Sequence, residues 1–416
     1  MSVKLIIPKQ PEINIGTTGH VDHGKTTLIQ ALTGIWTSSH SEELRRGITI
    51  KIGYADMPIY EYYDKQGRKR YVVDPTTVTD AAGEVKFKRA ISFVDCPGHE
   101  SLMANMLSGA AVMDGALLII AANEPCPRPQ TKEHLVALEI LGVKKIVVIQ
   151  NKVDLVSKEE ALKNYEQIVE FLQTSTVAKD APIIPVSSIF KLNMEYVLQA
   201  IQEYIPTPER DLSKPVRMFV IRSFDINKPG TDYKKLKGGV IGGSIIQGVV
   251  KVGDELEILP GYLERKNGKL VHEPIYTRVI SLSSRSLKLE EAHSGGLIGI
   301  QTDLDPSLTR ADRMVGNIAG KPGTLPEVRY DIEMDVKLFE YVVGTDESIK
   351  VTKIQKGEPL RLNVGAATTL GMVDSIKGDT IHVVLTKPVV IEEKWKVAIA
   401  RRVNNRWRLI GVGEAI

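Results

Sequence analysis

The chain has 416 residues, which is long for a single domain and suggests about two to four. Hydrophobic residues make up 43% and charged residues 25%, and the net charge is only +3, so overall charge gives no indication of nucleic-acid binding. Apolar runs stay shorter than a membrane span and the N-terminus lacks a secretory pattern. Two cysteines, Cys96 and Cys126, form no disulfide framework, so we expect a cytoplasmic protein without a membrane segment.

The first predicted elements, a strand at residues 13–16 and a helix at 26–33, flank the stretch GHVDHGKT at residues 19–26. This stretch fits the phosphate-binding pattern of a glycine, four residues and Gly-Lys-Ser/Thr. Glycines allow backbone N–H groups to converge on an anion, and the helix N-terminus adds positive potential. Lys25 is predicted to reach the β- and γ-phosphates and the Thr26 hydroxyl to bind Mg²⁺. The alternative is a glycine-rich turn that binds nothing, and the position of Lys25 weakens it.

A polar stretch at residues 41–50 follows, where a nucleotide-sensing loop would lie. Thr49 is a candidate second hydroxyl ligand of Mg²⁺, although an ordinary strand threonine explains it equally well. A strand at residues 90–94 then ends in Asp95-Cys96-Pro97-Gly98-His99. Asp95 is expected to hold Mg²⁺ through water, and Gly98 to offer its N–H to a γ-phosphate. Residues 54–89 between these segments are polar and indicate a small β insertion with a solvated basic tip at residues 65–70.

Helices are predicted at residues 100–113, 131–141, 157–173 and 194–204, and strands at 117–120, 146–149 and 183–186. The strand at 146–149 leads into Asn151-Lys152-Val153-Asp154. A carboxylate at Asp154 suits the two adjacent donors of guanine, which adenine lacks. The strand end at Ser187-Ser188-Ile189 is expected to face the guanine ring. Three motifs, each at a strand end, predict an α/β P-loop GTPase domain with a doubly wound, mostly parallel sheet at residues 1–208.

A proline-rich linker at residues 206–215 precedes a different pattern, in which short β-branched runs are separated by glycines. Strands are predicted at 216–223, 239–246, 248–252, 255–259, 276–282 and 295–301, and, after a second boundary, at 328–338, 359–364, 380–385, 396–403 and 406–412. We expect two all-β barrel domains, at residues 209–325 and 326–416. A basic and aromatic stretch at residues 401–408 is compatible with phosphate contacts, but strand alternation also explains it.

These motifs and the trailing barrels resemble the translational GTPases related to elongation factor Tu. Four stretches, at residues 33–56, 122–131, 222–231 and 304–309, are similar to the family of gamma subunits of archaeal and eukaryotic translation initiation factor 2. That resemblance implies a GTPase that binds methionylated initiator tRNA, delivers it to the small ribosomal subunit and releases it after hydrolysis. It also implies a heterotrimer, with the alpha subunit on the second domain and the beta subunit on the nucleotide domain.

The resemblance also assigns roles to individual residues. His99 matches the histidine that positions the attacking water, and Val21 and Ile48 match the apolar pair that screens it. Mg²⁺ is expected at Thr26, Thr49 and Asp95. The residues expected to contact GTP or GDP are Asp22, His23, Gly24, Lys25, Thr26, Thr27, Gly98, Asn151, Lys152, Asp154, Ser187, Ser188 and Ile189.

Asp22 would repel a triphosphate unless a cation or water intervenes. We therefore expect a second Mg²⁺ site shared by Asp22 and the Gly47 carbonyl, as members of the family can show; the alternative is an outward-facing salt bridge. Many members also carry two Cys-x-x-Cys pairs that form a zinc knuckle, but residues 54–89 contain no cysteine, so zinc is not expected. Tyr60, Tyr62 and Tyr63 are candidates for a replacement core.

Two other functions remain open at this point. One is an elongation factor of the same superfamily that carries aminoacyl- or selenocysteinyl-tRNA. The other is a GTP-gated assembly scaffold that grips protein subunits without needing turnover. The sequence shows no obvious arginine finger in cis, although Arg45 and Arg46 lie in the sensing loop, so intrinsic hydrolysis is expected to be slow.

Overall fold

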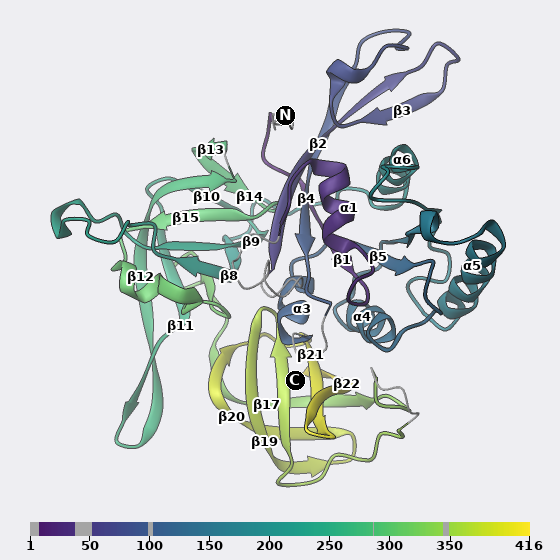
Figure 1. Ribbon diagram of the computed structural model, residues 1–416. Helices are drawn as coiled ribbons and strands as arrows, with labels where there is room; N and C mark the ends of the chain where they lie inside the picture. Colours follow the sequence, from purple (N-terminus) through teal and green to yellow (C-terminus); the bar gives the residue numbers. More distant parts are fainter. Residues whose placement is uncertain (1–7, 38–51, 99–102, 286, 344–348) are drawn as a thin grey trace. The chain divides into compact units, whose positions relative to one another are not determined.

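The computed structural model describes residues 8–37, 52–98, 103–285, 287–343 and 349–416 (Figure 1). The chain divides into two compact units, Met1–Pro208 and Glu209–Ile416. Within the described ranges, none of the helices combines the length and the apolar character that crossing a bilayer requires.

The first unit is built on a seven-stranded sheet in the order β3-β2-β4-β1-β5-β6-β7. Strands β4, β1, β5, β6 and β7 run parallel to one another, whereas β2 is antiparallel to both β3 and β4. This confirms the predicted mostly parallel sheet. The strands are β1 (Ile13–Thr18), β2 (Gly53–Tyr63), β3 (Lys69–Val72), β4 (Lys86–Asp95), β5 (Gly115–Ala121), β6 (Ile146–Asn151) and β7 (Ile183–Pro185).

Five described α-helices accompany this sheet: α1 (Lys25–Thr33), α3 (Met103–Ala110), α4 (Pro129–Ile140), α5 (Lys158–Gln173) and α6 (Met194–Tyr204). Apolar residues of α1 and α6 join one core with the inward-facing residues of the central strands. Helix α4 contacts β1 and β5. Helix α5 begins with a capping box in which Ser157 and Glu160 satisfy each other's backbone N–H groups. Helix α3 ends at Ala110, earlier than predicted, because residues 111–113 form a turn.

At the start of the predicted insertion at residues 54–89, residues 53–61 of β2 pair with β4 in the main sheet. Strands β2 and β3 form a hairpin that projects from the sheet edge (Figure 1). The predicted tyrosine core is wrong for Tyr63, whose side chain is 57% exposed. The hairpin is organised instead by the buried carboxylate of Asp64. Its oxygens accept hydrogen bonds from the backbone N–H groups of Gln66 and Arg68 and from the guanidinium groups of Arg68 and Arg70.

The second unit contains two β-barrels, as predicted. In the first, β11, β16, β8, β9, β15 and β12 follow one another, and pairing of β11 with β12 closes the ring around an apolar core. Its elements are β8 (Arg217–Phe224), β9 (Val240–Gln247), β10 (Val249–Lys251), β11 (Glu255–Lys266), β12 (Lys269–Ser284), β13 (Leu287–Leu289), β14 (Glu291–His293), β15 (Ile298–Thr302), α7 (Pro306–Thr309) and β16 (Ile318–Gly320).

The second barrel is closed by β17-β20-β19-β18-β21-β22, with β22 returning to β17. Its strands are β17 (Val328–Leu338), β18 (Pro359–Val364), β19 (Ala367–Lys377), β20 (Thr380–Val390), β21 (Lys396–Val403) and β22 (Arg406–Ala415). The basic stretch at 401–408 has structural partners here. Arg401 pairs with Glu358, the Arg408 side chain is buried, and Trp407 stacks on Arg361. These contacts favour barrel packing over a nucleic-acid surface for this stretch.

Candidate functional site

The loop between β1 and α1 follows a tight backbone path. Gly19 and Gly24 have φ values of +133° and +88°, which side-chain-bearing residues rarely adopt. A Cβ atom on Gly24 would lie 2.4 Å from the side-chain nitrogen of Asn151, and one on Gly19 would lie 2.2 Å from the carbonyl oxygen of Ile119. Close neighbours therefore leave no room for a side chain at either position. A backbone that turns this tightly is typical of a phosphate-binding loop.

Lys25 is the first residue of α1, and its ammonium group is buried under this loop. It donates hydrogen bonds to the carbonyl oxygens of Gly19 (3.0 Å) and His20 (2.6 Å). Burial lowers the pKa of Lys25 to about 8, and the nearby Asp95 carboxylate opposes that shift. A Cβ atom on Gly98 would lie 2.4 Å from the Lys25 ammonium nitrogen. The structure thus brings together Lys25 and Gly98, two residues that the motifs assign to the β- and γ-phosphates.

Asp95, at the end of β4, is fully buried and surrounded by threonine hydroxyl groups. Its Oδ1 accepts a hydrogen bond from Thr17 (2.9 Å), and its Oδ2 accepts from Thr26 (2.8 Å) and Thr37 (2.5 Å). Burial raises the pKa of Asp95, and the three hydroxyl groups act in the opposite direction. Hydroxyl and carboxylate oxygens are the ligands that Mg²⁺ prefers, so Thr26 and Asp95 fit this ion.

The ends of β6 and β7 are tied to the phosphate loop by one side chain. Asn151 accepts hydrogen bonds from the backbone N–H (3.1 Å) and the hydroxyl (2.9 Å) of Ser188, and it donates to the His23 carbonyl (2.9 Å). Next to it, Lys152 has a φ of +63°, and Asp154 is exposed. Ser187 is buried, whereas Ile189 is 70% exposed. The residues predicted to read guanine therefore sit on two adjacent strand ends.

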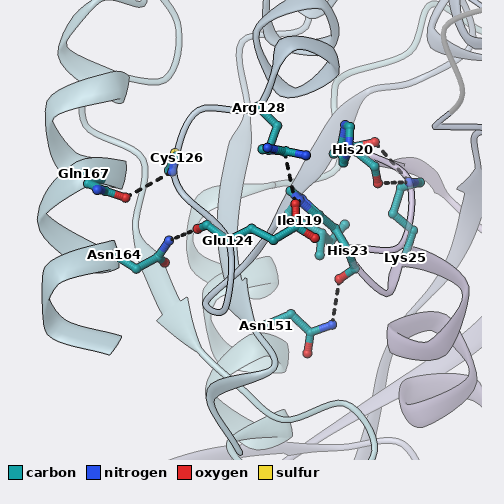
Figure 2. A network of polar contacts seen from close by, with 11 residues as sticks. His20, His23, Lys25, Ile119, Glu124, Cys126, Arg128, Asn151, Asn164 and Gln167 are labelled. Atoms are coloured by element: carbon teal, nitrogen blue, oxygen red, sulfur yellow. Dashed lines mark hydrogen bonds and ion pairs between the residues drawn. The ribbon is translucent and has the colours of Figure 1, made fainter. Parts of the chain in front are cut away.

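His23, in the loop itself, belongs to a network of polar contacts that the sequence did not indicate (Figure 2). The His23 ring is buried, with Nδ1 3.0 Å from the Ile119 carbonyl oxygen and Nε2 3.6 Å from the Glu124 carboxylate, which pairs with Arg128 at 3.1 Å. Desolvation lowers the pKa of His23 to about 3, so the ring is neutral. Because the His23 ring is buried in these contacts and its carbonyl accepts a hydrogen bond from Asn151, the backbone N–H is the group that His23 can offer to a phosphate.

A second buried histidine supports the loop from helix α4. His134 accepts a hydrogen bond through Nδ1 from the backbone N–H of Gly19 at 2.8 Å. Burial lowers the pKa of His134 well below 6.5, which keeps this nitrogen an acceptor. The signals for His134, Glu124 and Arg128 in the sequence were weak, since each is an ordinary polar residue within helix α4 or in the loop that precedes it. Thr17 and Thr37 were missed because their contacts with Asp95 join parts of the chain that are 78 and 58 residues apart.

The remaining predicted site residues lie either on the phosphate loop and helix α1 or outside the described residues. Val21 and Thr27 are half-buried on the loop and the first turn of α1, and Asp22 is exposed with a φ of +62°. Gly47, Ile48, Thr49 and His99 lie outside the described residues. In the part of the chain that is described, histidine, cysteine, aspartate and glutamate side chains do not gather in groups of three or more as metal ligands.

Comparison with known families agrees with this geometry. Residues 10–207 match the model of the elongation factor Tu GTP binding domain, and residues 330–415 match that of initiation factor eIF2 gamma, C terminal. Similar curated proteins include translation initiation factor 2 subunit gamma of Aeropyrum pernix, 54% identical over 97% of this chain and 98% of that protein. The proteins of the same name from Pyrococcus furiosus and Methanocaldococcus jannaschii are each 54% identical over 97% of this chain and 97% of their own length.

Two solved structures share the fold. A bacterial selenocysteine-specific elongation factor, EF-Sec, has a TM-score of 0.73 at 24% identity and covers 98% of this chain and 58% of its own. Elongation factor SelB from Methanococcus maripaludis, in complex with the GTP analogue GppNHp, has a TM-score of 0.70 at 23% identity and covers 99% of this chain and 79% of its own. At these identities the likeness concerns the fold alone.

Proposed function

Because the chain belongs to the family of translation initiation factor 2 gamma subunits, we propose that it carries methionylated initiator tRNA to the small ribosomal subunit while GTP is bound and releases it after hydrolysis. The chain is a translation-initiation GTPase, which converts GTP and water to GDP and phosphate, and its bound nucleotide is a guanine nucleotide. The observation that carries the proposal is the 54% identity over 97% of the chain.

For the phosphates, the proposed contacts are the loop backbone from Asp22 to Thr27, the Lys25 ammonium and the Gly98 N–H. The buried position of Lys25 and its closeness to Gly98 support this assignment. For the base, we propose Asn151, Lys152, Asp154 and the strand end Ser187-Ser188-Ile189, supported by the bonds between Asn151 and Ser188. Asp154 would accept from both donors of guanine, and adenine would leave its carboxylate unpaired.

Mg²⁺ is proposed at Thr26, Thr49 and Asp95, supported by the hydroxyl and carboxylate oxygens around Asp95. When bound, the ion would neutralise charge that develops on the phosphates during transfer to water. A second Mg²⁺ at Asp22 and Gly47 belongs to the same proposal. We propose that His99 positions the attacking water, behind an apolar screen of Val21 and Ile48, and that a partner must stimulate the reaction.

Alpha and beta subunits are the proposed protein partners, in a heterotrimer, with the alpha subunit on the barrel at residues 209–325 and the beta subunit on the nucleotide domain at residues 1–208. Residues 326–416 form the proposed third domain. The proposed location is the cytoplasm. Loss of the γ-phosphate would release the segments around residues 47–49 and 95–99, and the barrels would then drop the acceptor end of the tRNA.

The test is a filter-binding comparison of initiator and elongator tRNAs with GTP and with GDP. We expect methionylated initiator tRNA to bind in preference, and more tightly with GTP. Equal binding of elongator tRNAs would favour an elongation factor, and absence of any tRNA binding would favour a GTP-gated assembly scaffold. Measuring turnover with and without ribosomal subunits separates the scaffold from the other two functions.

A further inference from the structure

We propose that Thr37 competes with Mg²⁺ binding at the magnesium site. Its hydroxyl donates a hydrogen bond to Oδ2 of Asp95, and it must leave this oxygen when the ion and its water shell arrive. The inference rests on the proposed nucleotide and Mg²⁺ site. It adds a residue that the phosphate-loop motifs do not contain. Thr37 follows helix α1 and lies 58 residues from Asp95 in the chain.

The Asp95 carboxylate can accept only a limited number of hydrogen bonds. An ionised carboxylate oxygen offers about two lone pairs to hydrogen-bond donors. Among the described residues, Oδ2 accepts from Thr26 at 2.8 Å and from Thr37 at 2.5 Å, while Oδ1 accepts from Thr17 at 2.9 Å. Oδ2 therefore has its full set of donors before an ion is bound.

The fold makes room for Thr37 beside Asp95. Gly53, the first residue of β2, pairs with Asp95 in the sheet. A Cβ atom on Gly53 would lie 2.8 Å from the Thr37 Cβ and 3.2 Å from its carbonyl oxygen. The missing side chain of Gly53 thus allows Thr37 to rest against the strand and reach the carboxylate.

A bound Mg²⁺ ion needs hydrogen-bond acceptors for its water molecules. This ion dehydrates reluctantly and usually keeps several water molecules, whose hydrogens require acceptors. A water that donates to Oδ2 needs one of the two positions already taken. Thr26 is itself a proposed ligand and stays beside the ion, so Thr37 is the group that yields. Its bond stabilises the metal-free state alone, and it therefore lowers the apparent affinity for Mg²⁺.

Removing the hydroxyl should consequently strengthen Mg²⁺ binding. A single hydrogen bond to an ionised group contributes about 1.5–3 kcal/mol net, which corresponds to about a 10- to 150-fold change in affinity. We would load the full-length protein with a fluorescent GDP analogue and measure its release rate over a series of buffered Mg²⁺ concentrations. Thr37→Val should lower the half-saturating Mg²⁺ concentration by about that factor.

Three further variants make the result specific. Thr37→Ser restores the hydroxyl and should return the wild-type value. Gly53→Ala should displace Thr37 and shift the value in the same direction as Thr37→Val. Thr17→Val is the matched control, because its hydroxyl bonds Oδ1 and need not move when the ion arrives, so its shift should be smaller.

An unchanged or higher half-saturating concentration in Thr37→Val would overturn the inference. Equal shifts in Thr17→Val and Thr37→Val would overturn it as well, since they would indicate a general effect on the Asp95 environment. GDP binding by the wild type at saturating Mg²⁺ is measured in the same experiment. If the wild type fails to bind GDP there, the proposed nucleotide site falls and the role of Thr37 falls with it; if GDP binds and only the Thr37 shift is missing, the proposed function stands.

Discussion

The side-chain amide of Asn151 donates a hydrogen bond to the backbone carbonyl of His23 at 2.9 Å, across 128 residues of sequence. The same side chain accepts two hydrogen bonds from Ser188. One buried amide therefore holds the end of β6, the end of β7 and the phosphate loop together. Under the proposed assignment of these residues to the base and the phosphates, the two parts of the site are coupled through this side chain.

Asn151→Ala should weaken both GDP and GTP binding. The change leaves the carbonyl of His23 and the N–H of Ser188 without their buried partner, which costs about 1–3 kcal/mol for each unsatisfied group. We expect GDP affinity to fall by about 10- to 100-fold in isothermal titration. Ser188→Ala is the graded control, because it removes the hydroxyl bond and keeps the backbone N–H. Wild-type affinity in Asn151→Ala would refute the coupling.

Asp154→Asn should change which base is preferred. Asp154 is exposed, so the substitution should leave the thermal unfolding temperature nearly unchanged. Its amide presents a donor where guanine also presents donors, and we expect GTP affinity to fall by at least about 100-fold. Xanthosine triphosphate, which carries a carbonyl in place of the 2-amino group, should bind better to the variant than to the wild type. Competition binding measures both, and an unaltered order of preference would exclude Asp154 from base recognition.

The candidate nucleotide site could be proposed from the sequence because its motifs are short and each follows a buried strand. Lys25, Asp95 and Asn151 have positions that depend on local chain geometry at strand ends. Thr17 and Thr37 could not be found in this way. Thr17 reaches Asp95 through the parallel register of β1 with β4, and Thr37 reaches it through the space left at Gly53. Such contacts depend on tertiary structure, to which a single sequence gives no access.

Some strands of the two barrels could not be predicted from the sequence either. Strands β13, β14 and β16 have three residues each, too few to establish an alternation of apolar and polar side chains. Strand β19 was missed because Leu370 and Met372, which face outward and are exposed, obscure the pattern of its buried residues. Strands β11 and β12 run further than predicted because their outer halves pair with each other as a polar hairpin.

The stability of the nucleotide domain should fall as the pH falls below about 6.5, in part because of His134. Burial lowers the pKa of His134 in the folded state, so only the unfolded chain takes up the proton, and the free energy of unfolding decreases with falling pH. Each such proton contributes up to about 1.4 kcal/mol per pH unit. His134→Asn keeps an acceptor for the Gly19 N–H and does not titrate. Urea unfolding at pH 7 and pH 5 should show a smaller loss in this variant, and an equal loss would contradict the assignment.

Gly98→Ala should impair GTP binding more than GDP binding. The added Cβ would lie 2.4 Å from the Lys25 ammonium nitrogen and 3.0 Å from the carbonyl oxygen of Gly19, so the loop or its lysine must shift. The proposed bond from the Gly98 N–H goes to the γ-phosphate, which only GTP carries. We expect at least about a 10-fold loss of GTP affinity, equivalent to 1.4 kcal/mol. Gly83→Ala is the control, since a Cβ there meets open space.

Asp64→Asn should loosen the β2–β3 hairpin without weakening nucleotide binding. Burial alone would raise the pKa of Asp64, but hydrogen bonds from Arg68, Arg70 and Gln66 outweigh burial and lower this pKa to about 2. The carboxylate is therefore charged in the folded state. Its stabilising contribution is present above pH 3.8 and is lost as the pH falls toward 2. An amide lacks the charge that holds the two guanidinium groups, so trypsin should cut the variant faster at Arg68 and Arg70.

Two controls distinguish the effect of the Asp64 carboxylate on trypsin cleavage from the effects of a bound metal and of general surface charge. Residues 54–89 contain no cysteine, so a zinc chelator should leave the trypsin cleavage rate of the wild type unchanged. Glu84→Gln removes an exposed carboxylate from the same insertion and should also leave that rate unchanged. Faster cleavage after chelation would mean that a metal stabilises the hairpin. Equal cleavage rates of Asp64→Asn and the wild type would mean that Asp64 does not stabilise the hairpin, because the loss of its charge would then have no effect on how often the hairpin tip opens.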